Sequence, residues 1–136
     1  MTPDLLAELF LGITRFHDFT IQHHGGLPGF RDIGALHFAV ARPWMTAWGE
    51  PIFKTPFEKA SALAESIVRQ HPFNDGNHRS ALFSAYLVLG LHDLRPIAAQ
   101  AEQRTQILKL GTSVNSLQEF ALWLQQVSVR RSEIPS

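Results

Sequence analysis

Residues 71–79 place a histidine, a carboxylate, a glycine, an amide and an arginine around one turn, in the order His71-Pro72-Phe73-Asn74-Asp75-Gly76-Asn77-His78-Arg79. An unperturbed imidazole titrates at about pH 6.5, so His71 could take a proton from a hydroxyl group at neutral pH. Asp75 is a hard oxygen ligand of the kind that Mg²⁺ accepts beside water and phosphate. Arg79 can bind phosphate oxygens through two N–H groups. These residue types therefore predict a site that holds a nucleotide phosphate beside a hydroxyl group.

The surrounding residues predict that this run is a loop between two helices. Pro72 disfavours helical geometry at His71, so a helix over Phe57–Gln70 is expected to end there. Asn74-Asp75-Gly76 is a turn signature, and a second helix over Asn77–Leu89 begins with Asn77 as its N-cap or in its first turn. The first turn of a helix has backbone N–H groups without internal partners, and its dipole favours an anion. The start of the second helix is therefore a predicted phosphate cradle.

A purely structural alternative explains the same residues. In a plain helix–loop–helix corner, the Asn-Asp-Gly sequence turns the chain, Asn77 caps a helix, and His71 satisfies the last carbonyl groups of the preceding helix.

The loop resembles the Fic/Doc family, whose signature reads His-x-Phe-x-(Asp/Glu)-(Gly/Ala)-Asn-(Gly/Lys)-Arg. The matching residues are His71, Phe73, Asp75, Gly76, Asn77 and Arg79. An upstream run, Gly26 to Leu36 followed by Ala41-Arg42-Pro43, resembles the death-on-curing (Doc) branch, where G-x-P-G-x-R-D-x-G-x-L precedes A-R-P. The resemblance covers Gly25 to Leu89.

This resemblance implies an enzyme that transfers a phosphate-containing group from ATP, or another nucleoside triphosphate, to a hydroxyl group of a target protein. It implies that His71 is the general base and that Asp75 holds Mg²⁺ on the phosphates. The residues implied to bind the phosphates are Gly76, Asn77, His78 and Arg79. Members of the Doc branch are toxins that phosphorylate elongation factor Tu, so the expected function is a cytoplasmic, growth-inhibiting kinase.

Two departures from the family pattern keep alternatives open. AMP-transferring members carry Gly-Arg-x-x-Arg after the asparagine, whereas this chain has His78, Arg79 and Leu82 at the corresponding positions. The Doc branch also lacks the second arginine, but it usually has lysine where His78 stands. Histidine is shorter and often neutral, so the phosphate cradle is expected to be weaker or sensitive to pH. AMP transfer and a catalytically degenerate interaction protein are the alternatives.

The segment Trp44–Pro56 predicts a β-hairpin or an extended loop, because aromatic and apolar residues alternate irregularly around Gly49 and Pro51. It matches the place of the family's flap, a hairpin near the active-site loop along which the target chain lies as an added strand. Lys54 is the residue expected to contact phosphate or target there. Alternatively, the aromatic residues of this segment only cover a helix end.

The resemblance also implies an antitoxin partner. Family members of this kind are often restrained by a helix with the pattern (Ser/Thr)-x-x-x-Glu-(Gly/Asn). The nearest stretches are Thr46–Pro51 and Ser61–Ser66, and both fail at the last position. Restraint is therefore expected from a separate antitoxin chain that covers apolar surface near the N-terminal helix.

The rest of the chain predicts further helices over Pro3–His23, Asp32–Ala41, Pro96–Leu110 and Ser113–Val129, with Thr112 or Ser113 as the last cap. Apolar residues are expected on one face of the first helix: Leu5, Leu6, Leu9, Phe10, Ile13, Phe16 and Phe19. Small and apolar residues recur along Phe57–Gln70, which predicts a helix buried at the centre of the bundle. The expected fold is a single, mainly all-α Fic-type domain over residues 1–136 with a small hairpin flap.

Composition narrows the function classes. The 136 residues carry equal numbers of acidic and basic side chains and no cysteine. Nothing therefore indicates a nucleic-acid or membrane partner, a disulfide or a thiolate metal site, and a cytosolic location is expected. No apolar run has the length of a membrane span.

Metal binding by histidines is a further alternative. His71 and His78 lie seven apart, but Pro72 and Gly76 break the helix that would align them, and no HExxH spacing occurs. The other histidines are expected to be surface or capping residues: His17, His23, His24, His37 and His92.

Overall fold

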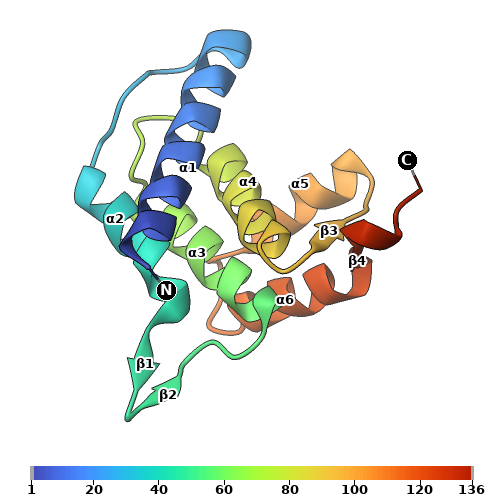
Figure 1. Ribbon diagram of the computed structural model, residues 1–136. Helices are drawn as coiled ribbons and strands as arrows, with labels where there is room; N and C mark the ends of the chain where they lie inside the picture. The colour runs from blue at the N-terminus through green and yellow to red at the C-terminus, as the bar shows by residue number, and fades with distance from the viewer. Residues whose placement is uncertain (1, 136) are drawn as a thin grey trace.

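Six α-helices form most of residues 2–135, which are the residues that the computed structural model describes (Figure 1). They are α1 (Pro3–His24), α2 (Ile33–Ala41), α3 (Pro56–Gln70), α4 (Asn77–Gly90), α5 (Gln100–Lys109) and α6 (Ser116–Val127). Two antiparallel strand pairs join β1 (Thr46–Ala47) to β2 (Glu50–Pro51) and β3 (Leu94–Pro96) to β4 (Ser128–Arg130). The 3-10 turns are η1 (Arg42–Trp44) and η2 (Arg131–Glu133). The predicted mainly helical class is confirmed.

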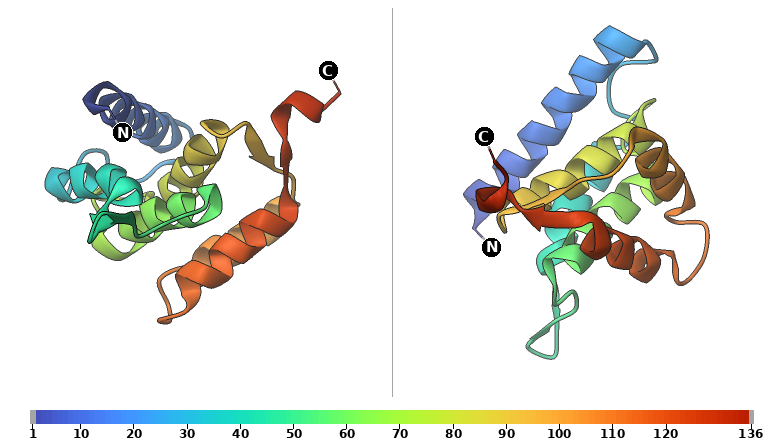
Figure 2. Two further views of the ribbon diagram at one scale, coloured as in Figure 1. Left: turned by 60° about the horizontal axis from the view of Figure 1, so that its bottom comes forward. Right: turned by 90° about the vertical axis from the view of Figure 1, so that its right-hand side faces the viewer.

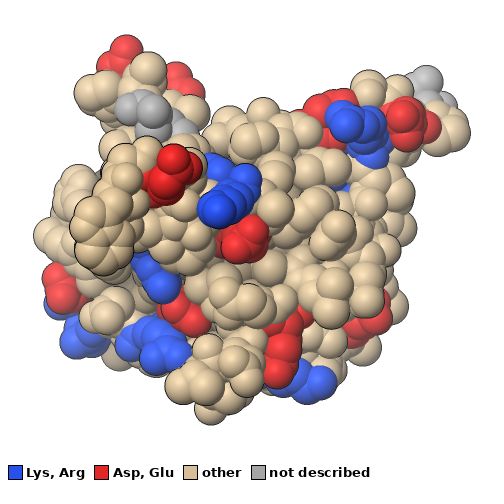
Figure 3. All heavy atoms as spheres, turned by 90° about the horizontal axis from the view of Figure 1, so that it is seen from below, with Lys and Arg blue, Asp and Glu red and all other residues tan. Residues whose placement is uncertain are grey.

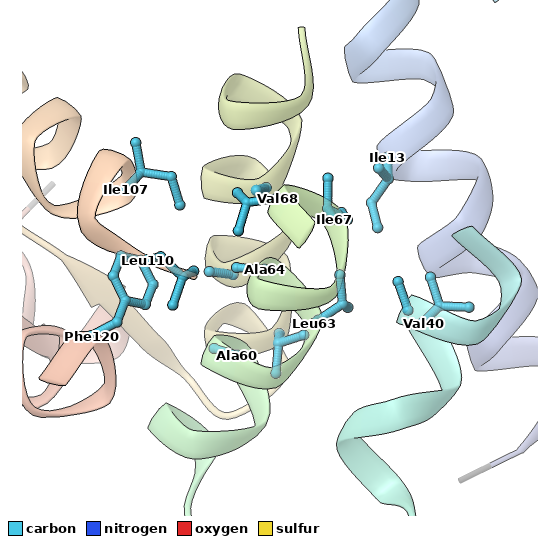
Figure 4. Close-up of a cluster of buried hydrophobic side chains, with 14 of the residues drawn as sticks. Ile13, Val40, Ala60, Leu63, Ala64, Ile67, Val68, Ile107, Leu110 and Phe120 are labelled. Atoms are coloured by element: carbon cyan, nitrogen blue, oxygen red, sulfur yellow. The ribbon is translucent and has the colours of Figure 1, made fainter. Parts of the chain in front are cut away.

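Helix α3 is the centre of the core, as the small-residue pattern predicted. Thr55 and Glu58 form a capping box at its start, so the N–H groups of these two residues are satisfied. Its middle turns are inaccessible to solvent, including Leu63 and Ile67. In Figure 4 these side chains lie between residues of α1 and α2 on one side and residues of α5 and α6 on the other. The helix that leads into residues 71–79 is therefore held on both sides.

A largely buried ion pair fixes α3 to the segment before it. The Arg42 guanidinium donates to Glu65 Oε1 at 2.9 Å, to the Ala62 carbonyl at 3.1 Å and to Ser66 Oγ at 3.1 Å. The Glu65 side chain is only 9% exposed. After α2 ends at Ala41, the chain continues as the 3-10 turn η1, since proline is tolerated in the first turn of a helix. The arginine of the Ala-Arg-Pro sequence is thus a structural residue.

Helix α1 packs on α4 through a stripe that differs in part from the predicted one. The Phe16 and Phe83 rings stack with centroids 4.0 Å apart. The fully buried positions of α1 are Leu9, Ile13, His17 and Thr20. Phe19, expected on the buried face, is 54% exposed. His17 is polar on the buried face because it contacts the loop after α3, and the Thr20 hydroxyl donates to the His17 carbonyl within the helix.

The predicted hairpin exists, but it lies far from residues 71–76. Strands β1 and β2 are joined by Trp48 and Gly49, which both have positive φ, as a two-residue hairpin turn requires. The hairpin precedes α3 and the 71–76 loop follows it. With 15 residues, α3 separates the two by about 22 Å. Figures 1 and 2 show the hairpin projecting from the opposite end of the molecule. The expected position beside the loop is therefore wrong in this structure.

The C-terminal third differs most from the sequence prediction. Pro96 lies in β3, and α5 begins only at Gln100. The last helix begins after Asn115, so neither Thr112 nor Ser113 caps it as predicted. Its first residue, Ser116, accepts a hydrogen bond from the Gly111 N–H. The β3–β4 pair was not predicted, because three-residue strands are too short for an alternating pattern to show.

Acidic and basic side chains are interspersed on the face that is seen from below in Figure 3, with uncharged surface between them. That face presents no field of a single sign. Among residues 2–135, no helix combines the length and apolar character that crossing a membrane requires.

Candidate active site

The loop begins at the C-terminal end of α3, where the Arg31 side chain contacts the last carbonyl groups of the helix. His71 takes a left-handed conformation with φ 51°, which is uncommon for a residue with a side chain. The Arg31 side chain donates to the His71 carbonyl at 2.7 Å and also to the Gln70 carbonyl. A cation at this position satisfies the free carbonyl groups and the negative end of the helix dipole. The His71 backbone is therefore held, while its imidazole is exposed.

The upstream segment pairs with the loop along its backbone. The Arg31 N–H donates to the Pro72 carbonyl at 2.8 Å, and the Asn74 N–H donates to the Gly29 carbonyl at 3.0 Å. The Asn74 side chain donates to the Pro28 carbonyl at 2.9 Å. The two sequence segments that carry the family resemblance are thus in direct contact, and the first supports the second.

Asp75 is held by the same segment. One of its carboxylate oxygens, Oδ2, accepts from the Leu27 N–H at 3.2 Å. A Cβ atom added to Gly26 would lie 3.1 Å from that oxygen, and Gly26 has φ 114°. Glycine is favoured at this position, because the backbone conformation strains other residues and an added Cβ would press on the Asp75 carboxylate. The other oxygen, Oδ1, makes no hydrogen bond to the described residues.

The Asn77 side chain braces the loop from within. Its Oδ1 accepts from the Phe73 N–H at 3.1 Å, and its Nδ2 donates to the Phe73 carbonyl at 3.0 Å. Asn77 is buried, and it is the first residue of α4 with Gly76 as the N-cap. Its amide group is therefore occupied by the loop, and the predicted contact with an anion is left to its backbone N–H.

His17 is the supporting residue that sequence reasoning missed. It is 1% exposed, its Nε2–H donates to the Asp75 carbonyl at 2.7 Å, and its ring stacks on Phe73 at 3.9 Å. The only available signal was its spacing of four residues from Ile13 on the buried face of α1. Its expected role as a surface or capping residue is wrong.

Replacement of His17 by phenylalanine is expected to keep the stacking and leave the Asp75 carbonyl without a donor. The lost hydrogen bond is expected to lower the free energy of unfolding by about 1–2 kcal/mol and to speed hydrogen exchange in residues 74–76. Urea unfolding and amide exchange measure these effects. The matched control is His37→Phe, since His37 is also stacked on a phenylalanine but is exposed. Equal losses in both variants would contradict the assignment.

The start of α4 is an open anion site. Gly76 adopts φ 73° and has no side chain with which to cap the helix. The first helical hydrogen bond runs from the Ser80 N–H to the Gly76 carbonyl at 3.1 Å. The N–H groups of Asn77, His78 and Arg79 therefore have no acceptor among the described residues. Unpaired N–H groups and the positive end of the helix dipole together favour an anion.

These groups open into a cavity of about 970 Å³ between the loop, the end of α1 and helix α5. Six of the seven predicted site residues line it: His71, Asp75, Gly76, Asn77, His78 and Arg79. The seventh, Lys54, does not. It follows the hairpin at the opposite end of α3, so the structure separates it from the phosphate cradle. Residues of α5 complete the wall, and the sequence did not indicate them.

The charge on His78 is disfavoured. Its pKa is lowered from the ordinary value by partial burial and then by the nearby His71 and Arg104. The neutral imidazole is therefore the main form at pH 7. This agrees with the expectation that histidine gives a weaker cation here than lysine would.

His71 and His78 line the same cavity, but residues 2–135 contain no cluster of three His, Cys, Asp or Glu side chains able to hold a metal ion. The alternative of a histidine metal site thus finds no ligand set in the described residues.

The fold and the loop define a Fic-type protein, and comparison with known families agrees. Residues 11–89, more than half of the chain, match the model of the Fic/DOC family, so the chain belongs to this family. The chain is 38% identical over 71 residues to the protein named Toxin Doc of Mycolicibacterium smegmatis, a match that covers 52% of this chain and 55% of that protein. It is also 38% identical over 73 residues to the Protein kinase doc of Escherichia phage P1, covering 54% and 57%. The chain thus spans about half the length of these curated relatives.

Proposed function

We propose that this protein is a Doc-like toxin that transfers the γ-phosphate of ATP to a hydroxyl group of a target protein. The observation that carries the proposal is the shared cavity. An exposed imidazole, a carboxylate and a helix start with unpaired N–H groups face one space large enough for a nucleotide. The names of the two relatives support the toxin and kinase parts of the proposal.

In the proposed reaction His71 is the general base. Its imidazole accepts the hydroxyl proton of a target Ser, Thr or Tyr while the hydroxyl oxygen bonds to the γ-phosphorus. The bond from that phosphorus to the β-phosphate oxygen breaks, and ADP leaves. The N–H groups of residues 77–79 and the Arg79 guanidinium, which makes no hydrogen bond or ion pair to the described residues, stabilise the phosphate charge.

The residues present fit Mg²⁺ bound mainly through the nucleotide. Among residues 2–135, Asp75 is the only carboxylate that lines the cavity, and one of its oxygens accepts no hydrogen bond from them. A single carboxylate together with water and phosphate oxygens is a usual environment for Mg²⁺. When bound, the ion neutralises phosphate charge during transfer. Asp75 would hold it at the start of α4.

Phosphate transfer is preferred to AMP transfer because of Leu82. This residue occupies the position of the second arginine in AMP-transferring members, and it lines the cavity as an apolar side chain. Without that arginine, no group on α4 holds the γ-phosphate away from His71. AMP transfer remains the second candidate, and the label experiment below separates the two.

The proposed partners are an antitoxin and a target protein in the cytoplasm. Glu65, in the stretch nearest to the internal restraint pattern, is occupied by Arg42, and Glu50 lies in the distant hairpin. Neither carboxylate reaches Arg79, so a separate chain is the proposed restraint. Leu11 and Phe19 of α1 are half exposed and offer apolar surface for it. Elongation factor Tu is the first target to assay.

The test is incubation of the protein and a cell lysate with ATP labelled at the γ- or the α-phosphate, with His71→Ala as the control. The proposal expects γ-label on a protein only with the wild type. Transfer of α-label instead would support AMP transfer. Failure of both labels to reach any protein, where a known relative transfers one, would overturn the enzyme function.

Replacement of His78 by lysine is expected to tighten ATP binding by roughly 10-fold, because lysine stays charged at pH 7. Because the pKa of His78 is lowered, the wild-type imidazole gains its charge only at pH values below the ordinary pKa of a histidine side chain. Wild-type affinity should therefore rise with falling pH more than that of the lysine variant. Calorimetric titration with Mg·ATP at pH 8 and pH 5 measures both. Parallel pH dependence in the two proteins would show that His78 does not bind the phosphates.

A further inference from the structure

We infer that Arg104 binds the nucleotide polyphosphate from the wall of the cavity that α5 forms. Arg104 would be a second cation for the phosphates, supplied from a different helix than Arg79. The inference rests on the proposed function and adds a binding residue to it. In this sequence, neither His78 nor Leu82 provides a permanently charged side chain for the phosphates.

Helix α5 is fixed against α4 in a defined orientation. The Tyr86 hydroxyl donates to Gln103 Oε1 at 2.6 Å, and Gln103 Nε2 donates to the Ala98 carbonyl at 2.8 Å. Tyr86 is one helical turn after Leu82 on the same face of α4. The neighbour of Gln103 on α5 is Arg104, and both line the cavity together with Leu82. The structure therefore holds Arg104 at the cavity rather than on a mobile loop.

Arg104 is available to bind an anion in the cavity. Its side chain is exposed and makes no hydrogen bond or ion pair to the described residues. The cavity is lined by two arginines, Arg79 and Arg104, against one carboxylate, Asp75. An uncompensated pair of guanidinium groups on two walls attracts a multivalent anion between them. After burial and His71, the charge of Arg104 also contributes to the lowered pKa of His78, in keeping with a position near the phosphate cradle.

The remaining lining of α5 suits the other part of a nucleotide. Ile107 and Leu108 follow Arg104 by one turn and line the cavity with Leu82. Apolar side chains one turn after Arg104 would accommodate a base while the two arginines hold the phosphates. The chemical class that fits both parts is a nucleoside triphosphate.

The experiment is equilibrium binding of Mg·ATP, inorganic tripolyphosphate and adenosine to the wild type, Arg104→Gln and Arg104→Lys. The matched control is Arg95→Gln, because Arg95 is an exposed arginine of β3 that does not line this cavity. Loss of one charge-assisted contact predicts roughly 10- to 100-fold weaker binding of Mg·ATP and tripolyphosphate by Arg104→Gln. Adenosine binding should not change, the lysine variant should recover part of the loss, and Arg95→Gln should match the wild type.

Equal affinities of Arg104→Gln and Arg95→Gln for Mg·ATP would overturn the inference and leave the proposed kinase intact. A loss that extends equally to adenosine would also overturn it, since Arg104 would then support the cavity rather than bind phosphate. Wild-type protein that binds Mg·ATP through Arg104 but transfers no label would retain the inference and refute the transferase. Absence of binding of Mg·ATP and tripolyphosphate to the wild type would overturn both.

Discussion

Replacement of His71 by alanine is expected to lower the rate of phosphate transfer by about 1,000-fold, the usual contribution of a general base. The His71 backbone is fixed by Arg31, and its imidazole is free in the cavity. Removal of the ring therefore leaves the phosphate cradle at residues 76–79 in place. Affinity for Mg·ATP should change by less than about 3-fold, because the base acts on the hydroxyl rather than on the nucleotide. Single-turnover kinetics and calorimetry measure the two quantities separately.

His24→Ala is the matched control for that variant. His24 lines the same cavity from the end of α1 but takes no part in the proposed reaction. It should transfer phosphate at nearly the wild-type rate. An equal loss of rate in both histidine variants would contradict the role of His71. So would a His71→Ala protein that has lost nucleotide binding together with activity.

Replacement of Arg42 by alanine is expected to lower the free energy of unfolding by about 3 kcal/mol. The change leaves the Glu65 carboxylate, 9% exposed, without its main cation inside the bundle, and it removes the donor to the Ala62 carbonyl and Ser66 Oγ. Helix α3 carries His71 at its end, so the loop should loosen with it. Urea denaturation monitored by circular dichroism measures the loss.

The control is Arg69→Ala. Arg69 also approaches Glu65, but at 3.8 Å and from a side chain that is 48% exposed, so its loss should cost no more than about 0.5 kcal/mol. The double variant Arg42→Ala, Glu65→Gln should recover part of the stability, since no buried charge then stays unpaired. The assignment fails if both arginine variants destabilise equally or if the double variant is less stable than Arg42→Ala.

Local sequence signals predicted the loop well, because each of its conformations depends on a nearby residue. Pro72 ends α3 at Gln70, and Gly76 supplies the positive φ from which α4 begins. The small residues of α3 predicted its central position because close packing of helices requires them.

Contacts between distant segments could not be predicted from such local sequence signals. His17 supports Asp75 across 58 positions of sequence, and its polar character on a buried face has no local explanation. The position of the hairpin follows from the direction of α3, and α5 is placed beside the cavity by its packing on the core and by the hydrogen bond between Tyr86 and Gln103. Propensity and spacing contain none of these relations.

In the proposed function, the start of α4 binds the phosphates of a magnesium nucleotide beside His71. A titration of isotopically labelled protein with Mg²⁺ and a non-hydrolysable ATP analogue, followed through its backbone amide spectrum, locates this binding residue by residue. The largest shifts are expected at the N–H groups of Asn77, His78 and Arg79, which have no acceptor among the described residues. Saturable binding that leaves these three amides unshifted and moves residues away from the cavity would contradict the claim.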